Sequence, residues 1–488
     1  MLLFHVAPAR AAAGAEVGME DERLLLGEPA AAAAAVAEWA ALGVDVVRVH
    51  ASWRAIAPGR TARRPPPGFD GADPGDPGYA WAALDRAVAL VRGAGMRVAL
   101  TVTGPGPQWA SRDPARRNPI LDPDPRAFGR FARAVAQRYG PAVDRYLIWN
   151  EPNQPGWLQP QSDCAHGRCT PVAPHLYRAL VRAAVPAIHA ADPGAEVLIG
   201  ELAPIGERAR SSRSALAPLP FLRALGCVDR HYRALQTGRC RGFRPAGADA
   251  LGHHPHGKRL APDQHNPDPD EAQIGDLARL ERAVDRLTAG RRLRVTAPGL
   301  RRLPLHLTEF GYQTSPPDLA AGVTLAEQAA YLQQAAYVAW KDRRVRSLSL
   351  YQWNDEPVHH RGPGVRAYSG WQSGLSFLTG APKPALSVFP APLVADLPPG
   401  RTRGRLWGQV RPGGAHVITV ERRPLGAATF EPVAAVATDP AGYWTLDGPL
   451  DPLASYRATW PAESGPAATG ILDLGADPGR RLRAAAPP

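Results

Sequence analysis

Eight short apolar runs alternate with amphipathic helical stretches between about residues 16 and 385, and this alternation constrains the fold most strongly. The runs are EVGME (16–20), VDVVRVH (44–50), MRVALTVTG (96–104), RYLIWNE (145–151), EVLIGE (196–201), ADALGHHPH (248–256), LPLHLTEFG (303–311) and VRSLSLYQW (345–353). Most of them lack the polar alternation of a strand with one wet face, which indicates a parallel sheet buried on both faces. Eight such units predict an α/β chain with a (β/α)8 TIM barrel over residues 16–389. No GxGxxG motif follows the first run, which disfavours a dinucleotide-binding sheet.

Helical periodicity fills the segments between these runs. The predicted helices are Ala30–Leu42, Ala80–Gly93, Pro125–Tyr139, Pro174–Ala190, Glu271–Leu287 and Thr324–Lys341. Gly43, Gly95 and Gly140 follow three of them, at the position where a left-handed residue ends a helix.

The composition changes after residue 389. Residues 390–400 are rich in proline and predict a linker, and residues 401–488 contain short runs with period-two patterning. This pattern predicts a small all-β sandwich domain. The stretch Thr438–Trp444 resembles one hairpin of carboxypeptidase-regulatory-like or immunoglobulin-like modules. At the other end, residues 1–15 join an apolar run to small residues, which is typical either of a signal-peptide remnant or of a frayed tail.

The formal net charge of +12 raises the question of a nucleic-acid partner. All of the 57 basic residues except Lys258, Lys341 and Lys383 are arginines, a bias typical of a GC-rich genome. No dense basic run with interleaved aromatic residues is present, so the sequence predicts no nucleic-acid binding. No stretch reaches the roughly 18 apolar residues of a membrane span, so it predicts no transmembrane segment.

Four cysteines indicate the compartment of the protein. Four cysteines allow three pairings, of which the two local ones, Cys164–Cys169 and Cys227–Cys240, are the simplest. The surrounding segments are too irregular for a zinc ribbon. Two loop disulfides predict an exported protein, secreted or at the cell surface.

Two carboxylates stand at the ends of predicted barrel strands. Glu151 ends the fourth run in YLIWNEPNQPGW (146–157), directly after Asn150, and Glu309 ends the seventh run in HLTEFGYQT. A carboxylate at the carboxyl end of a barrel strand points into the active-site mouth. Two carboxylates that converge there provide what glycoside hydrolysis requires.

With these motifs the chain resembles the clan A glycoside hydrolases, and within them the cellulase-like and family-39-like enzymes. The resemblance covers roughly residues 16–390 and implies a retaining mechanism with Glu151 as acid/base and Glu309 as nucleophile. It also implies that Arg48 supports the nucleophile and that Asn150 binds the sugar 2-hydroxyl. In a retaining enzyme the two carboxyl groups are expected about 5–5.5 Å apart.

The sixth and eighth runs match this resemblance less closely. His254 carries over, but His256 stands where the clan has a tyrosine near the nucleophile. Trp353 is the candidate for the sugar-stacking tryptophan, with its register open by a residue or two. Further substrate-binding candidates are aromatic residues beyond strand ends. These are Trp109, Trp157, Tyr312 and Trp371.

The histidines of the sixth run also invite a metal interpretation. They are His253, His254, His256 and, farther on, His265. Adjacent residues on a strand point to opposite faces, so few of these rings are expected to converge. The sequence therefore predicts neither a metal nor a cofactor.

The leading interpretation is an exported retaining glycosidase that cleaves O-glycosidic bonds, expected to be β-linked, in an oligo- or polysaccharide. Two alternatives stay open. The barrel binds an extracellular glycan without cleaving it, or the sandwich is the binding module and the barrel presents it. Because barrels host unrelated chemistries, the fold alone supports none of the three.

Overall fold

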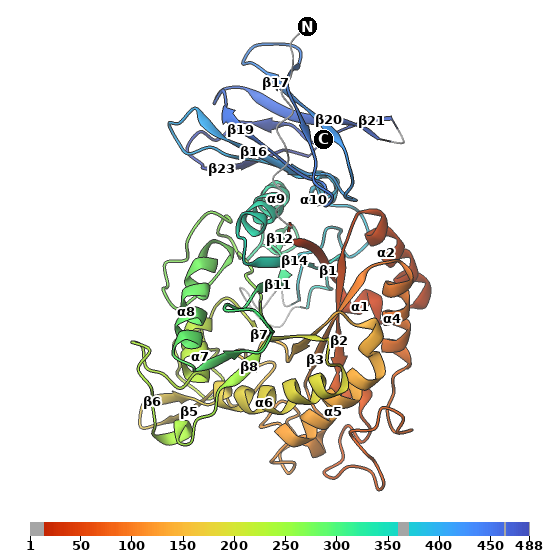
Figure 1. The fold of residues 1–488 in the computed structure, drawn as a ribbon, viewed down its shortest axis with the longest axis vertical. Coiled ribbons are helices and arrows are strands. Elements are labelled where there is room, and N and C mark those ends of the chain that lie inside the picture. Colours follow the sequence, from red (N-terminus) through yellow and green to blue (C-terminus); the bar gives the residue numbers. More distant parts are fainter. Residues whose placement is uncertain (1–13, 360–369, 463–464, 488) are drawn as a thin grey trace.

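The computed structural model describes residues 14–359, 370–462 and 465–487. All but the last two residues of the predicted signal-peptide remnant lie outside this part of the chain. A closed parallel barrel stands at the centre, ringed by helices, and a β-sandwich packs on its side (Figure 1). The predicted fold class is thus confirmed.

All eight predicted barrel strands are present. In chain order they are β1 (Glu16–Glu20), β2 (Val46–Ser52), β3 (Arg97–Thr103), β4 (Arg145–Ile148), β7 (Glu196–Leu202), β9 (Ala250–His253), β11 (Leu305–Phe310) and β14 (Val345–Tyr351). Each pairs in parallel with its neighbours, and β1 closes the barrel by pairing with both β14 and β2. The remaining strands of this half are β5 (Ser162–Ala165), β6 (Arg168–Pro171), β8 (Ala246–Ala248), β10 (Leu293–Val295), β12 (Thr314–Ser315) and β13 (Val323–Thr324).

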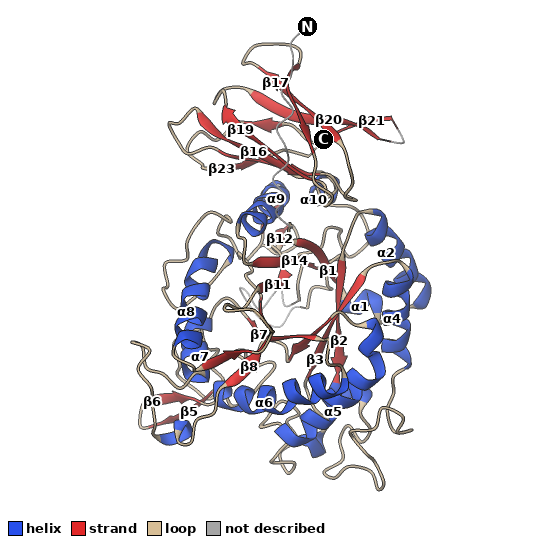
Figure 2. Cartoon of the chain, in the orientation of Figure 1, coloured by secondary structure: helices blue, strands red, loops and turns tan. Residues whose placement is uncertain are grey.

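Helices surround the barrel on the outside (Figure 2). The longer ones are α2 (Pro29–Ala41), α4 (Ala82–Gly93), α5 (Pro125–Tyr139), α6 (Ala173–Ala191), α7 (Pro218–Leu225), α8 (Leu277–Ala289) and α9 (Leu325–Lys341). Short helical turns are α1 (Glu22–Leu25), α3 (Trp53–Ile56), α10 (Pro384–Val388), η1 (Gln108–Ala110), η2 (Gly140–Ala142), η3 (Gly238–Cys240) and η4 (Ile274–Asp276).

Two of the sequence expectations for these helices were wrong. Helix α8 begins at Leu277 and not at Glu271, because the Glu271 carboxylate instead accepts hydrogen bonds from the Gly206 backbone and the Asn266 amide. Gly43 and Gly95 have φ of +74° and +81°, the left-handed conformation that ends a helix. Gly140 has φ of −39°, because the chain continues there into η2 instead of turning away.

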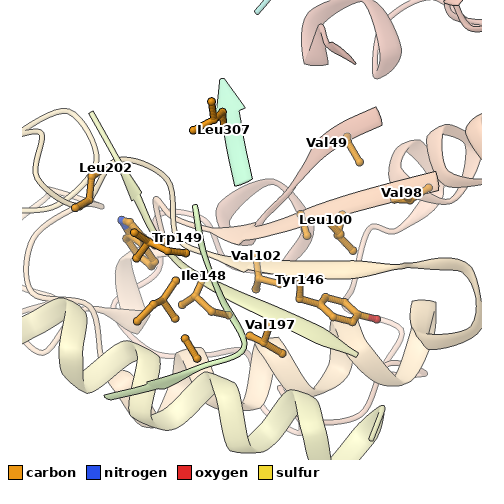
Figure 3. Packing of buried hydrophobic residues seen from close by; sticks show 14 of the residues in the cluster. Val49, Val98, Leu100, Val102, Tyr146, Ile148, Trp149, Val197, Leu202 and Leu307 are labelled. Atoms are coloured by element: carbon orange, nitrogen blue, oxygen red, sulfur yellow. The ribbon is translucent and has the colours of Figure 1, made fainter. Parts of the chain in front are cut away.

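Two apolar clusters form the core of the barrel half, and Figure 3 shows residues of the larger one. Val49, Val98, Leu100, Ile148 and Val197 belong to a large cluster that includes residues of the surrounding helices. A second, small cluster takes one residue from each of five neighbouring strands: Val46, Ala99, Leu147, Leu198 and Ala250. Because side chains alternate between the faces of a strand, residues in phase with this second cluster point into the barrel. Arg48 and His50 are in phase with Val46, so their polar side chains point inward above the apolar layer.

The C-terminal region forms two antiparallel sheets. One contains β15 (Leu393–Asp396), β16 (Arg403–Gln409), β19 (Tyr443–Pro449) and β23 (Leu482–Ala484). The other contains β17 (Val417–Arg423), β18 (Glu431–Ala437), β20 (Ser455–Ala462), β21 (Gly465–Ala468) and β22 (Leu472–Asp473).

The segment 390–400 is not a free linker. Its strand β15 pairs with β16 and β23, and alternate residues are buried on opposite faces. Leu393 and Ala395 belong to the sandwich core, whereas Val394 packs in a cluster with Tyr337 of α9. The prolines therefore mark the entry to a strand, and the sandwich shares a buried apolar interface with the barrel.

Both predicted disulfides are present. Cys164–Cys169 joins the antiparallel strands β5 and β6, and Cys227–Cys240 closes the loop that follows α7. Among the described residues, no helix is long and apolar enough to cross a membrane.

Candidate active site

A cleft of about 500 Å³ opens at the carboxyl ends of the barrel strands. Its lining residues come from these strand ends and the loops that follow them. They are Glu20, Glu22, Arg23, Leu26, Gly27, His50, Asn150, Glu151, Trp157, Glu309, Tyr351, Gln352, Glu356 and Trp371. None of these residues belongs to the sandwich, so within the described residues the cleft is formed by the barrel and its loops.

Arg48 lies beneath the floor of this cleft and is fully buried. Its Nη1 donates to Glu309 Oε1 at 2.7 Å and also to Glu20. Its Nη2 donates to Asn150 Oδ1 at 2.7 Å and to Glu201 Oε2 at 2.8 Å. One guanidinium therefore links the ends of five barrel strands, and the planar fork of arginine suits such multiple contacts.

Glu309 is held as an anion by its neighbours. Burial opposes its ionisation, but the charges of His254 and Arg48 outweigh that cost and hold the pKa of Glu309 well below its ordinary value. His254 Nδ1 lies 3.5 Å from Glu309 Oε1, and His256 Nε2 lies 3.6 Å from Oε2. A buried, ionised carboxylate with one face toward the cleft is the form that a nucleophile requires.

Glu151 follows β4 on a strained piece of backbone. Trp149 and Glu151 have φ of +66° and +37°, a region that side-chain-bearing residues rarely adopt. Glu151 Oε1 lies 3.2 Å from His254 Nδ1, and the side chain is 17% exposed, against 7% for Glu309. Glu151 is thus the more accessible of the two carboxylates, as a residue that exchanges protons with leaving groups and water must be.

His254 lies between the two carboxylates and is fully buried. Burial favours its neutral form, but contacts with Glu309, Glu151 and Glu201 outweigh burial and raise the pKa of His254 to about 10. Both carboxylate oxygens lie within 3.5 Å of its Nδ1, so they are less than about 7 Å apart, a bound that includes the roughly 5–5.5 Å expected of a retaining pair.

His256, which stands where the resemblance predicts a tyrosine, lies beside Glu309. The His256 ring stacks on Trp371 with centroids 4.6 Å apart, and Tyr351 lies edge-on to Trp371 at 5.6 Å. Tyr351 donates through its hydroxyl to Glu356 at 3.1 Å. His256 therefore faces the same carboxylate that the expected tyrosine would face.

Three charged residues of the site were missed in the sequence. Glu20, His50 and Glu201 lie at the carboxyl ends of the first, second and fifth barrel strands, and this position was the signal that could have found them. Burial and repulsion from Glu309 raise the pKa of Glu20 to about 7 against the opposing charge of Arg48. His50 Nδ1 pairs with Glu22 at 2.9 Å, and its ring meets Trp157 edge-on at 5.9 Å.

Of the aromatic residues predicted to bind substrate, Trp157 and Trp371 line the cleft. Trp109, Trp353 and Tyr312 do not. Trp109 packs against Trp53 and Phe69 and donates to the Pro58 carbonyl in a separate hollow.

The other two are buried in the protein core. Trp353 packs against Trp39 behind the last strand. The Tyr312 hydroxyl donates to the Leu260 carbonyl, and a side chain on Gly257 would collide with its ring. The structure places these three residues outside the cleft, while Tyr351, two residues before Trp353, lines it. The local pattern does not reveal whether a residue after a strand turns toward the mouth or the core.

Two groups of potential metal ligands occur in the cleft among the described residues. His254 and His256 join Glu309 in one, and Glu20 and His50 join it in the other, with ligand atoms within 4.8 Å of one another. Arg48 and His254 already occupy the carboxylate oxygens as cations, so we interpret both groups as ion-pair networks and assign no metal to them.

The third group of potential ligands and the remaining histidines do not indicate a metal site either. The third group, His175 with Cys227 and Cys240, has both sulfurs in a disulfide. Of the other histidines in or after the sixth run, His253 donates through Nε2 to the Ala272 carbonyl, and His265 pairs with Asp276. His254 and His256 do converge, however, because they are two residues apart.

Comparisons with known proteins show the fold of the chain. No protein-family model matches the sequence, and no curated protein matches it significantly. A family 39 glycoside hydrolase from the gut symbiont Bacteroides cellulosilyticus WH2 is 14% identical, with a TM-score of 0.50 over 92% of this chain and 82% of that one.

Two further structures were matched. A GH5_18 protein from Streptomyces cattleya, in complex with GlcNAc, is 19% identical over 77% of this chain and 78% of that one, with a TM-score of 0.45. The endo-β-1,4-mannanase from Thermotoga petrophila is 11% identical over 97% and 98%, with a TM-score of 0.41. The chain shares its fold with the family 39 structure, in agreement with the clan A resemblance of its motifs.

Proposed function

We propose that the protein is a retaining glycoside hydrolase that cleaves O-glycosidic bonds, β-linked ones, by double displacement. One observation supports this most strongly. The buried, ionised Glu309 and the more accessible Glu151 both line the cleft and both contact the same nitrogen of His254, with oxygens less than about 7 Å apart. A sugar bound in the cleft above His254 would thus present its anomeric carbon to both carboxylates.

In the first half of the reaction Glu309 attacks the anomeric carbon and Glu151 gives its proton to the leaving oxygen. A glycosyl ester forms on Glu309 and the glycosidic bond breaks. In the second half Glu151 takes a proton from water, and the water oxygen displaces Glu309 from the sugar. Two inversions at one carbon retain its configuration.

The neighbouring residues orient the sugar. Asn150 Oδ1 accepts from Arg48, so its amide nitrogen remains to donate to a hydroxyl in the cleft, which fits the expected contact with the 2-hydroxyl. Trp157 and Trp371 supply apolar faces in the same cleft, suited to stacking on sugar rings. The substrate is therefore an oligo- or polysaccharide.

Two disulfides support an exported, extracellular enzyme. The non-catalytic alternative depended on His256 in place of tyrosine. His256 lies 3.6 Å from Glu309 Oε2, and within the described part of the chain neither of its ring nitrogens has a hydrogen-bond partner, so its ring is available to the nucleophile. This contact favours catalysis over mere binding.

The test compares Glu309→Ala with Glu151→Ala on aryl β-glycosides. Glu309→Ala should lose turnover of every substrate, and azide should restore it with an inverted α-glycosyl azide. Glu151→Ala should spare substrates with activated aryl leaving groups, and azide should yield a retained β-glycosyl azide. Glu431→Ala, an exposed pair partner of Arg422 on the sandwich, is the matched control and should behave as wild type. Full activity in either cleft variant, or an inverted product from wild type, would contradict the assignment.

A further inference from the structure

Glu201 is a buried glutamate that the double displacement does not use directly. Its side chain is fully buried below the cleft. It lies near the carboxyl end of β7, where the pairing with β9 shifts register between Gly200 and Leu202. Glu201 has φ of +48° within this irregularity. Such bulges re-aim a side chain, here into the barrel.

Two glycines make room for this arrangement. A Cβ on Gly252 would lie 1.8 Å from Glu201 Oε1, so any larger residue there would displace the carboxylate. Gly200 has φ of +109°, and a Cβ there would lie 2.5 Å from the Gly252 carbonyl. The backbone around Glu201 therefore leaves space for a buried carboxylate at this position.

Glu201 contacts three polar side chains. Oε2 accepts from Arg48 Nη2 at 2.8 Å and lies 3.5 Å from His254 Nε2, and Oε1 accepts from Thr308 Oγ1 at 2.8 Å. Burial raises the pKa of Glu201, but Arg48 and His254 outweigh burial and lower it below its ordinary value. Glu201 is thus a permanent anion on the far side of the His254 ring from the two cleft carboxylates.

We propose that Glu201 is a positioning residue that keeps His254 as an imidazolium between Glu151 and Glu309 throughout the catalytic cycle. This inference rests on the proposed function. The charged groups around His254 come from every packed strand: Glu151 beyond β4, Glu201 on β7, His253 and His256 beside it, Glu309 on β11, and Arg48 on β2, which also binds Glu20 of β1.

The charge on Glu309 changes during the reaction, and this change determines what Glu201 does for His254. Before attack, the imidazolium stabilises the Glu309 carboxylate. Once Glu309 is esterified it carries no charge, whereas Glu151, which has given up its proton, becomes an anion beside His254; Glu201 is the one of these three carboxylates that stays charged in both halves. By keeping His254 protonated, Glu201 maintains the positive charge that then favours the carboxylate form of Glu151, the base that activates water. No proton leaves His254 in either half.

The first measurement, an NMR titration, does not depend on glycosidase activity. Histidine ring resonances are followed by NMR against pH in the full-length protein, and the His254 signal is identified by its loss in His254→Asn. In wild type the ring should stay protonated through about pH 9, since its pKa is about 10. Glu201→Gln removes the negative charge, so His254 should titrate at least about one pH unit lower. Glu201→Asp, which keeps the charge, should stay closer to wild type.

Thr308→Val is the matched control, because it removes the other hydrogen bond of Glu201 without changing any charge. It should leave the His254 titration in place. An unchanged titration in Glu201→Gln would overturn the proposal. If Glu201→Gln does not fold, Glu201→Asp and Thr308→Val decide, because a titration that moves equally in both would mean that packing and not charge matters.

The second measurement is the pH dependence of kcat/KM and of the hydrolysis of a trapped glycosyl-enzyme. Glu201→Gln should lose about tenfold or more, with the loss growing toward high pH as His254 becomes neutral. A loss that is uniform across pH and equal to that of Thr308→Val would indicate a structural role and contradict the proposal. If wild type cleaves no glycoside, the proposed function fails, whereas the NMR titration still decides the state of His254.

Discussion

Two networks of charge in the protein each centre on a buried group, Arg48 or Asp396, and have opposite balances of charge. At the barrel mouth, the single guanidinium of Arg48 binds three carboxylates, those of Glu20, Glu201 and Glu309. At the interface between α9 and the sandwich, the single carboxylate of Asp396 accepts from three donors. These are the Tyr337 hydroxyl at 2.7 Å, Lys341 Nζ at 2.7 Å and Arg481 Nε at 2.6 Å.

The consequences for the carboxylates differ accordingly. At the interface, burial raises the pKa of Asp396, but its three donors outweigh burial and lower it to about 2, so one protonation state is strongly preferred. At the mouth, the pKa of Glu20 rises to about 7 while that of Glu309 falls far below its ordinary value. Carboxylates driven apart in this way are typical of catalytic sites, whereas a fully satisfied carboxylate is typical of a structural contact.

The largest effect is expected when the centre of the mouth cluster is removed. Arg48→Met should lower kcat/KM by about 10³-fold or more, because Glu309 loses a charged donor that holds it ionised. It should also destabilise the fold by roughly 3–5 kcal/mol, since three buried carboxylates remain without their counter-charge. Kinetics and urea unfolding measure both, with Arg422→Met on an exposed sandwich strand as the control. Near-normal kinetics in Arg48→Met would show that the mouth cluster is structural like the one at the interface.

Substitution of one tryptophan in each region should distinguish the two regions by the property that is lost. Trp407 of β16 is fully buried and packs on Tyr337, Trp340 and Tyr443, so Trp407→Ala should cost about 3–5 kcal/mol of stability with unchanged kinetics. Trp371 lines the cleft, so Trp371→Ala should raise KM by about tenfold with little loss of stability. Thermal unfolding and initial rates check both, and an exchange of these two outcomes would contradict the division of the molecule.

The interface carboxylate gives a smaller effect of known sign. The pKa of Asp396 is lowered in the folded protein, so its contribution is present above its ordinary value of 3.8 and is lost as the pH falls toward about 2. Asp396→Asn should therefore cost about 2 kcal/mol near neutral pH and progressively less in acid. Activity should not change. The free energy of unfolding measured against pH tests this, and a difference independent of pH would show that Asp396 does not act through its charge.

Glu20→Gln should have the smallest effect and the opposite dependence on pH. Because the pKa of Glu20 is raised from 4.5 to about 7, its favourable contribution is present below pH 4.5 and is lost as the pH rises through 7. The melting temperature of Glu20→Gln should thus gain on wild type between about pH 5 and pH 8. Parallel melting curves for the two proteins over this range would mean that Glu20 is ionised at every pH tested.

The contrast between strand ends and loops explains how much of the site the sequence predicted. Glu151 and Glu309 were found because each ends an apolar run, and barrel closure brings all such ends to one mouth. Glu20 and Glu201 end runs as well, yet nothing local distinguishes a carboxylate in an ion-pair network from one at a helix cap. Trp109, Trp353 and Tyr312 were misplaced because a change of one residue in register, or one turn of loop, moves a side chain from cleft to core.

The linker prediction failed for a related reason. Prolines near residues 390–400 are typical of a flexible connection, but whether such a segment stays free depends on what lies beside it. Here Val394 meets Tyr337 of α9 while Leu393 and Ala395 enter the sandwich core, so burial on two faces stabilises a strand. Truncation after residue 389 should accordingly expose apolar surface on α9 even though the cleft keeps all of its lining residues.

The number and order of the barrel strands, the strand ends that carry Glu151 and Glu309, and the two local disulfides could all be predicted from the sequence. These depend on periodicity and on neighbours close in the chain, which short-range patterns encode directly. Barrel closure, in contrast, was required for Arg48 to link five strands, for His254 to contact two cleft carboxylates, and for Glu201 to lie behind it. Those contacts join residues 28 to 261 positions apart, and their charges acquire their properties only when closure of the barrel removes them from water.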